Sequence, residues 1–85
     1  MTRKDPPPVG TVERLRWLEA EAEQAYGDMY EAQAGSALAA RYSDAKEFLH
    51  DAIELARRLG HSDEAERLTQ RLEEIKAVFR RQFPA

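Results

Sequence analysis

The chain has 85 residues, of which 16 are acidic and 13 basic, with a formal net charge of -3 and no cysteine. A chain of this length forms one small domain, the absence of cysteine excludes disulfides and thiolate metal sites, and the acidic balance argues against a nucleic-acid partner. No apolar run approaches the roughly 20 residues that span a bilayer, and the first residues contain no apolar signal segment. We therefore expect a cytoplasmic protein without a membrane partner.

Residues 1–10 are expected to form a flexible, proline-rich tail. Three consecutive prolines, Pro6 to Pro8, lack backbone N–H donors and favour an extended polyproline conformation. Thr11 is a suitable N-cap, so we expect the first helix at residues 11–34. Gly27 inside this helix costs about 1 kcal/mol relative to alanine, which a close approach of another helix would explain.

The end of the first helix has two interpretations. Apolar side chains recur at steps of three and four residues from Val12 to Met29, but the pattern then slips out of phase. The simplest account is a break at which Gly35 ends the first helix and Ser36 caps the second. The alternative is a first helix that continues to Arg41.

The second helix, expected at residues 36–59, is the element around which the other two are arranged. Its apolar stripe consists of Leu38, Tyr42, Ala45, Leu49, Ala52, Ala56 and Leu59. Phe48 and Leu55 flank this stripe on one side and Ile53 on the other. Because one neighbouring helix would not cover so wide an arc, the pattern predicts two neighbours.

A short turn separates the second helix from the third. Gly60 is expected to end the second helix in a left-handed conformation. Ser62 or Asp63 would cap the third helix, with Asp63 and Glu66 forming a capping box. The third helix is expected at residues 62–83, antiparallel to the second because the turn is so tight.

The sequence therefore predicts an all-α fold, a small antiparallel three-helix bundle. The expected core is Leu15, Leu18, Ala22, Met29, Leu38, Tyr42, Ala45, Leu49, Ala52, Ala56, Leu68, Leu72, Ile75 and Phe79. Three charged pairs at helical spacing are expected on solvated faces: Glu54–Arg58, Asp63–Arg67 and Glu73–Lys76.

The chain contains no residue pattern that indicates catalysis. His50 has Glu47 three residues before it and Glu54 four after, but one exposed helix offers no fourth ligand, so we expect no metal site. A metalloprotease motif, a phosphate-binding loop and a nucleophile elbow are all missing, and a helical core of this size leaves no deep pocket. We therefore expect no enzyme and no cofactor. The basic end with Arg80 and Arg81 suits the helix dipole better than a phosphate backbone.

Part of the chain, about residues 42–80, resembles a tetratricopeptide repeat. The residues that carry the resemblance are Tyr42-Ser-Asp-Ala45, Phe48-Leu49, Ala52-Ile53 and Leu59-Gly60, then Ala65 and Leu68. Upstream the sequence departs from the pattern, since Met29, Gln33 and Ser36 stand where the repeat has Trp, Gly and Tyr. The resemblance implies a helical hairpin and a peptide- or protein-binding role. Residues 75–83 also look like the end of short uncharacterised bacterial all-helical proteins, which implies no activity.

These patterns favour a protein–protein interaction module that self-associates, with a protein partner or a second copy of the chain as its ligand. Trp17 lies outside the apolar stripe of the first helix and is a candidate anchor. The candidate interface is Trp17, Tyr30, Phe48, Leu55 and Val78, and the expected assembly is a homodimer. In the competing monomer, Phe48 and Leu55 face the third helix, Ile53 faces the first, and Pro6 to Pro8 cover Trp17.

The alternative function is a small-ligand-binding or regulatory domain. In it, Tyr26, Tyr30, Tyr42 and His50 would line a polar, aromatic pocket between the first two helices. The sequence has no convergent cluster of charges there, which favours the interaction module.

Overall fold

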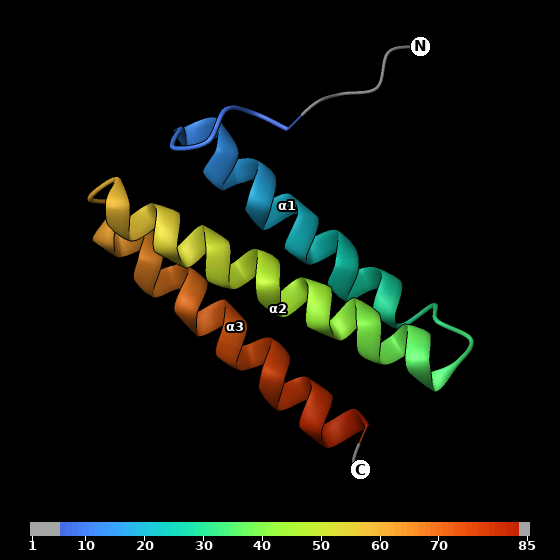
Figure 1. The fold of residues 1–85 in the computed structure, drawn as a ribbon. Coiled ribbons are helices and arrows are strands. Elements are labelled where there is room, and N and C mark those ends of the chain that lie inside the picture. The colour runs from blue at the N-terminus through green and yellow to red at the C-terminus, as the bar shows by residue number, and fades with distance from the viewer. Residues whose placement is uncertain (1–5, 84–85) are drawn as a thin grey trace.

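The computed structural model describes residues 6–83, which form three α-helices and no strand. Helix α1 spans Val12–Met29, α2 spans Gly35–Arg58 and α3 spans Ser62–Gln82. Figure 1 shows that α2 runs between the other two and antiparallel to both, so α1 and α3 are parallel. The predicted all-α three-helix bundle is confirmed, and none of the described helices is long and apolar enough to cross a membrane.

The start of α1 is capped as the sequence predicts, and the cap also holds the tail. The Thr11 side-chain oxygen accepts a hydrogen bond from the Arg14 backbone N–H at 3.0 Å. The same hydroxyl donates to the Pro8 carbonyl at 2.8 Å, and the Arg14 guanidinium donates to the Pro7 carbonyl at 3.2 Å. Two of the three prolines are thus tied to the first turn of α1.

Helix α1 ends at Met29, five residues before the expected end. Tyr30 and Glu31 donate backbone hydrogen bonds to the carbonyls three residues before them, so the last turn tightens and stops. A break between the first two helices is confirmed, but it lies at residues 30–34 instead of at Gly35 and Ser36, and a first helix that continues to Arg41 is excluded. The predicted caps are wrong: Gly35 is the first residue of α2, and Ala34 occupies the N-cap position with extended backbone and no side-chain cap.

For the turn between α2 and α3, the predicted left-handed glycine is confirmed, whereas the predicted side-chain cap of α3 is wrong. Gly60 has φ +78°, its N–H donates to the Arg57 carbonyl at 3.1 Å, and the His61 N–H donates to the Ala56 carbonyl at 2.9 Å. This is a Schellman motif. Because His61 also accepts the first bond of α3, the helix begins at once at Ser62. The expected side-chain caps from Ser62 or Asp63, and with them the capping box, are therefore wrong.

One hydrophobic cluster joins the three helices, and α2 supplies its centre. Leu49 is 0 % exposed, and it lies in the cluster together with Leu15 from α1 and Leu68 from α3. Eleven predicted core residues are buried as expected. The three that are only half-buried lie near the end of the bundle where α2 begins and α3 finishes: Leu38, Tyr42 and Phe79. Four buried residues were not in the predicted core: Ala25, Ile53, Leu55 and Ala65.

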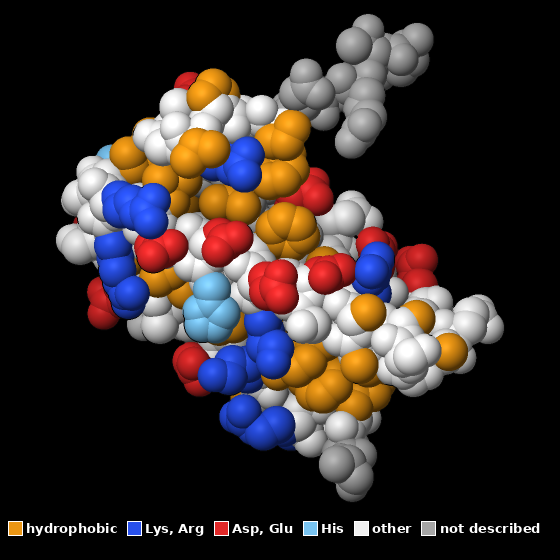
Figure 2. Space-filling model, in the orientation of Figure 1, with side chains coloured by type: hydrophobic (Ala, Val, Ile, Leu, Met, Phe, Trp, Pro, Cys, Tyr) orange, Lys and Arg blue, Asp and Glu red, His pale blue; other side chains and the backbone are white. Residues whose placement is uncertain are grey.

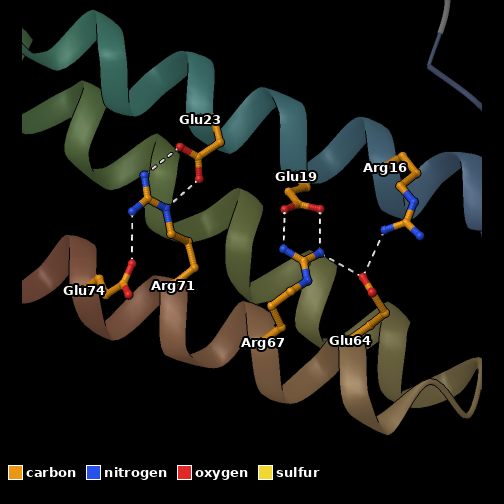
Figure 3. Close-up of polar contacts among 7 residues, drawn as sticks. All are labelled: Arg16, Glu19, Glu23, Glu64, Arg67, Arg71 and Glu74. Atoms are coloured by element: carbon orange, nitrogen blue, oxygen red, sulfur yellow. Dashed lines mark hydrogen bonds and ion pairs between the residues drawn. The ribbon is translucent and has the colours of Figure 1, made fainter.

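Ion pairs bridge α1 and α3 across the face shown in Figure 3. Each joins residues 48 positions apart: Arg16–Glu64, Glu19–Arg67 and Glu23–Arg71. We call these pairs the α1–α3 zipper. Its two stronger members are bidentate, with N···O distances of 2.7 and 2.9 Å for Arg67–Glu19 and of 2.7 and 2.8 Å for Arg71–Glu23. The zipper fixes the register of two parallel helices that are not neighbours in sequence.

The zipper replaces one of the expected pairs on α3. Arg67 binds Glu19 and, at 2.8 Å, Glu64, in place of the predicted partner Asp63. Hydrogen bonds from Arg67 hold the pKa of Glu19 and of Glu64 below the usual carboxyl value. The other two expected pairs are confirmed: Glu73–Lys76 at 3.4 Å and Glu54–Arg58 at 3.6 Å.

Candidate functional site

The structure brings two of the five predicted interface residues together. The rings of Trp17 from α1 and Phe48 from α2 meet edge-to-face, with centroids 6.0 Å apart and an interplanar angle of 88°. Both side chains are half-buried and pack against the core. Such a pair combines a large apolar surface with partial exposure, as aromatic anchors at interfaces do.

Leu55 must be removed from the predicted interface. It is only 6 % exposed and belongs to the core cluster of a single chain. With Leu18 of α1 it lines a hollow between α1 and α2, so Phe48 and Leu55 lie on the α1 side of α2. The assignment of these two side chains to the third helix is therefore wrong as well. Apolar periodicity located the flank correctly but did not show which helix covers it.

Tyr30 and Val78 lie apart from the aromatic pair. Tyr30 follows the end of α1, is 48 % exposed, and its ring centroid lies 6.1 Å from that of Phe83. Val78 is half-buried near the end of α3. The predicted interface is thus not one continuous surface, and Trp17 with Phe48 forms its best-defined part.

Two hollows lie along α2 and share Asp51, the first with lining residues from the tail, α1 and α2, and the second with lining residues from α2 alone. The first is lined by Val9, Arg14, Leu18, Asp51, Glu54, Leu55 and Arg58. The second is lined by Asp44, Glu47, Phe48 and Asp51. We call the two hollows together the trough. Its apolar residues come from the tail, α1 and α2, and Phe48 connects it to Trp17.

Arg14 covers part of Trp17. Its guanidinium carbon lies 4.8 Å from the centre of the Trp17 ring, within the range of a cation–π interaction. Arg14 also lines the trough and binds the Pro7 carbonyl. A guanidinium that the tail helps to hold thus covers part of Trp17, while the covering of Trp17 by Pro6 to Pro8 stays a prediction. Trp17 therefore borders the trough on two sides, through Arg14 and through Phe48.

A band of carboxylates forms the outer edge of the trough. Its members follow one another along α2 at steps of three, four and three residues: Asp44, Glu47, Asp51 and Glu54. Figure 2 shows acidic side chains in a row along α2, with hydrophobic side chains beside it on the side of α1. Asp44 pairs with Arg41 at 3.1 Å and Glu54 with Arg58 at 3.6 Å. Glu47 and Asp51 make no ion pair with any residue in the described range 6–83.

The sequence alone could have revealed this band. Glu47 and Glu54 flank His50, and Glu54 also pairs with Arg58, but neither interpretation indicated that Asp44 and Asp51 belong to the same row. A period of three and four residues in acidic positions marks one helix face as clearly as the same period in apolar positions. In residues 6–83, no group of three or more His, Asp or Glu side chains is arranged to hold a metal ion.

The tyrosines of the alternative pocket pack against other rings. Tyr42 stacks on Phe79 with centroids 3.7 Å apart, and the Tyr26 and Tyr30 hydroxyl oxygens lie 3.1 Å apart. Burial, and then the hydrogen bond to Tyr30, raise the pKa of Tyr26. His50 is exposed on α2. These contacts hold the ends of the three helices together and favour packing over a ligand pocket.

Comparison of the chain with protein-family models, with curated proteins and with solved structures finds no match.

Proposed function

We propose that this protein is a protein–protein interaction module and that the trough is its docking surface. The observation that carries the proposal is the Trp17–Phe48 pair, two large half-buried aromatic side chains, of which Phe48 lines a hollow together with three carboxylates. Tryptophan is enriched among residues that dominate binding energy, and a partner that covers this pair would remove a large apolar area from water.

We propose no catalytic role, because the charged side chains that cluster are paired with one another at the surface. Among residues 6–83, no polar or charged side chain is buried. Apart from Tyr26, the groups with a shifted pKa belong to ion pairs that hold α1 and α3 together: Glu19, Glu64, Arg67 and Arg71. Their pKa shifts have a structural cause, which is the usual explanation outside an active site.

The structure reduces the surface that supported the expected homodimer, so our proposal does not include self-association through the trough. Ile53 and Leu55 lie in the core of one chain, and the large apolar side chains that remain clearly exposed in the described range are Val9, Val12 and Tyr30. A two-fold contact through the trough would also bring two bands of four carboxylates into one interface, with only Arg14 and Arg58 of each copy as lining guanidiniums. A partner other than a second copy is therefore favoured at the trough.

The proposal is tested by capturing partners with the immobilised full chain and two matched variants. Phe48→Ser changes the trough, and Val78→Ser makes a similar change at a half-buried residue elsewhere. We expect a partner that the wild type and Val78→Ser retain and that Phe48→Ser loses, with all three proteins equally helical by circular dichroism. If Phe48→Ser retains every protein that the wild type retains, the trough is not the docking surface.

A further inference from the structure

We infer that the trough binds a cationic amphipathic helix of another protein. The inference rests on the proposed interaction function and names the partner. The apolar face of this helix would cover Phe48 and the side chains between α1 and α2, while its Lys or Arg side chains would face the carboxylate band. Helix-in-groove docking is a common form of peptide recognition, and its specificity comes from anchors at helical spacing.

The dimensions of the trough fit such a helix. Its lining residues on α2 extend from Asp44 to Arg58. These 14 steps at ~1.5 Å each correspond to about 21 Å, or roughly four helical turns. Apolar side chains line it at both levels, with the exposed Val9 beside the buried Leu18 and Leu55 in one hollow and the half-buried Phe48 in the other. An elongated groove parallel to a helix suits an elongated ligand better than a compact small molecule.

The charges around the groove decide which helix it accepts. Four carboxylates line the trough against two guanidiniums, Arg14 and Arg58. Glu47 and Asp51, in the middle of the band, have no ion-pair partner among the described residues and are exposed, so they can pair with incoming cations. Arg14 over Trp17 shows that the aromatic edge of the trough also accommodates a guanidinium. An acidic helix would meet repulsion along its whole length.

The chain's own basic helix end is not the occupant. Residues 76–83 contain Lys76, Arg80 and Arg81 and no acid. However, the apolar side of this segment is already in use, because Phe79 stacks on Tyr42 at 3.7 Å and contacts Phe83 at 5.3 Å. A second copy would have to unpack α3 to offer this face. The geometry therefore favours a helix from a different protein.

The test uses Trp17, the single tryptophan of the chain, as a reporter beside the trough. The probes are a Leu/Lys amphipathic peptide of ~18 residues, which forms about five helical turns, and its Leu/Glu counterpart. We expect saturable 1:1 binding of the Leu/Lys peptide with a change in Trp17 emission, and affinity that falls as salt is added. We expect no binding of the Leu/Glu peptide.

Two charge-reversal variants separate the trough from net charge. Glu47→Lys with Asp51→Lys reverses the centre of the band, and Glu66→Lys with Glu73→Lys makes the same change in net charge at exposed positions on α3. We expect the first variant to weaken Leu/Lys peptide binding by about tenfold or more and the second by about twofold or less. All four substituted residues are exposed, so both variants should keep the fold, which circular dichroism checks.

Four results would overturn the inference. Equal weakening by the two variants would mean that the peptide follows net charge alone. Saturable binding of the Leu/Glu peptide, or no binding of the Leu/Lys peptide, would mean that the band does not select a cationic helix. If light scattering shows a wild-type dimer that Glu47→Lys with Asp51→Lys dissociates, the occupant is a second copy. A dimer of this kind would overturn the inference about the partner but not the proposed interaction function. The interaction function itself fails only if no partner depends on the trough.

Discussion

Two glycines show how the same residue serves opposite purposes in this chain. Gly60 has φ +78° in the α2–α3 turn, a conformation that side chains with a Cβ rarely adopt. Gly27 lies inside α1 with ordinary helical backbone, and no atom would contact a Cβ built there. The close helix approach expected at Gly27 is therefore not what this residue provides.

Alanine at these positions should change stability in opposite directions. Gly60→Ala should lower the free energy of unfolding by about 1 kcal/mol, although no atom lies within 4 Å of the new Cβ, because the strain is entirely in the backbone. Gly27→Ala should raise it by about 0.5–1 kcal/mol through helix propensity. Urea denaturation of both variants checks this pair. A destabilised Gly27→Ala protein would show that the glycine has a packing role after all.

Leu49 should be the most sensitive core position of α2. It is 0 % exposed and lies in the cluster that joins all three helices. Leu49→Ala should destabilise the protein by roughly 2–5 kcal/mol, a large part of what a small domain has. Thermal denaturation followed by circular dichroism measures the effect. A melting temperature within a degree or two of wild type, on the order of a few tenths of a kcal/mol, would mean that α2 is not the centre of the core.

At the scale of the helices, the sequence predicted the number and order of the helices better than the residues that end and cap them. The Gly60 turn could be predicted because a single residue type is required there. The end of α1 could not be predicted in the same way. It depends on backbone hydrogen bonds from Tyr30 and Glu31 to the carbonyls three residues before them, and no particular side chain is required for these bonds. The start of α3 at Ser62 was predicted correctly, but its cap was not, since the His61 backbone serves both the Schellman turn and the first helical bond.

The contacts between α1 and α3 could not be predicted from local sequence patterns. Glu19 and Arg67 meet because two parallel helices are offset by 48 residues, and this offset depends on the length of α2 and both turns. For the candidate site, Trp17 and Phe48 could be recognised as surplus apolar residues, but their contact could not be derived. Leu55 was misplaced because the width of an apolar arc does not reveal which neighbour covers it.

The α1–α3 zipper should stabilise the bundle measurably through Glu19. Its carboxylate is 24 % exposed and accepts two hydrogen bonds from Arg67. Glu19→Gln should reduce the free energy of unfolding at neutral pH by about 0.5–1 kcal/mol, more than an isolated surface pair, because the geometry is bidentate and networked. Glu66→Gln, at an exposed position of α3, serves as the control and should have little effect. Equal effects of both variants would contradict a specific role of the zipper.

The same pairs predict how stability depends on pH. Hydrogen bonds from Arg67 lower the pKa of Glu19 and of Glu64 below 4.5 in the folded protein. At pH values near and below 4.5, the unfolded chain therefore binds more protons than the folded chain. The contribution is present in full above pH 4.5 and disappears as the pH falls through the lowered pKa values. Urea titrations at acidic and neutral pH measure how much the free energy of unfolding falls in acid. This fall should be smaller for Glu19→Gln than for wild type. An identical fall would contradict a contribution from the Glu19–Arg67 pair.

At the scale of the whole molecule, a single chain buries or partly buries most of its large apolar side chains without a partner. Phe48 packs on Trp17, Ile53 and Leu55 are buried, and ion pairs bridge the gap between α1 and α3. The helical hairpin of α2 and α3 is present, while the resemblance to a tetratricopeptide repeat stays a prediction. The trough between α1 and α2 remains as the surface with both apolar anchors and available charge.

The most direct test of this account is the mass of the protein in solution by light scattering. At low salt and ~100 μM, where even a micromolar dimer would be populated, we predict the 9.7 kDa mass of one chain. The reason is that a symmetric contact through the trough would oppose like charges. A particle of twice this mass that Phe48→Ser returns to a single chain would contradict the account, because the trough would then bind a second copy.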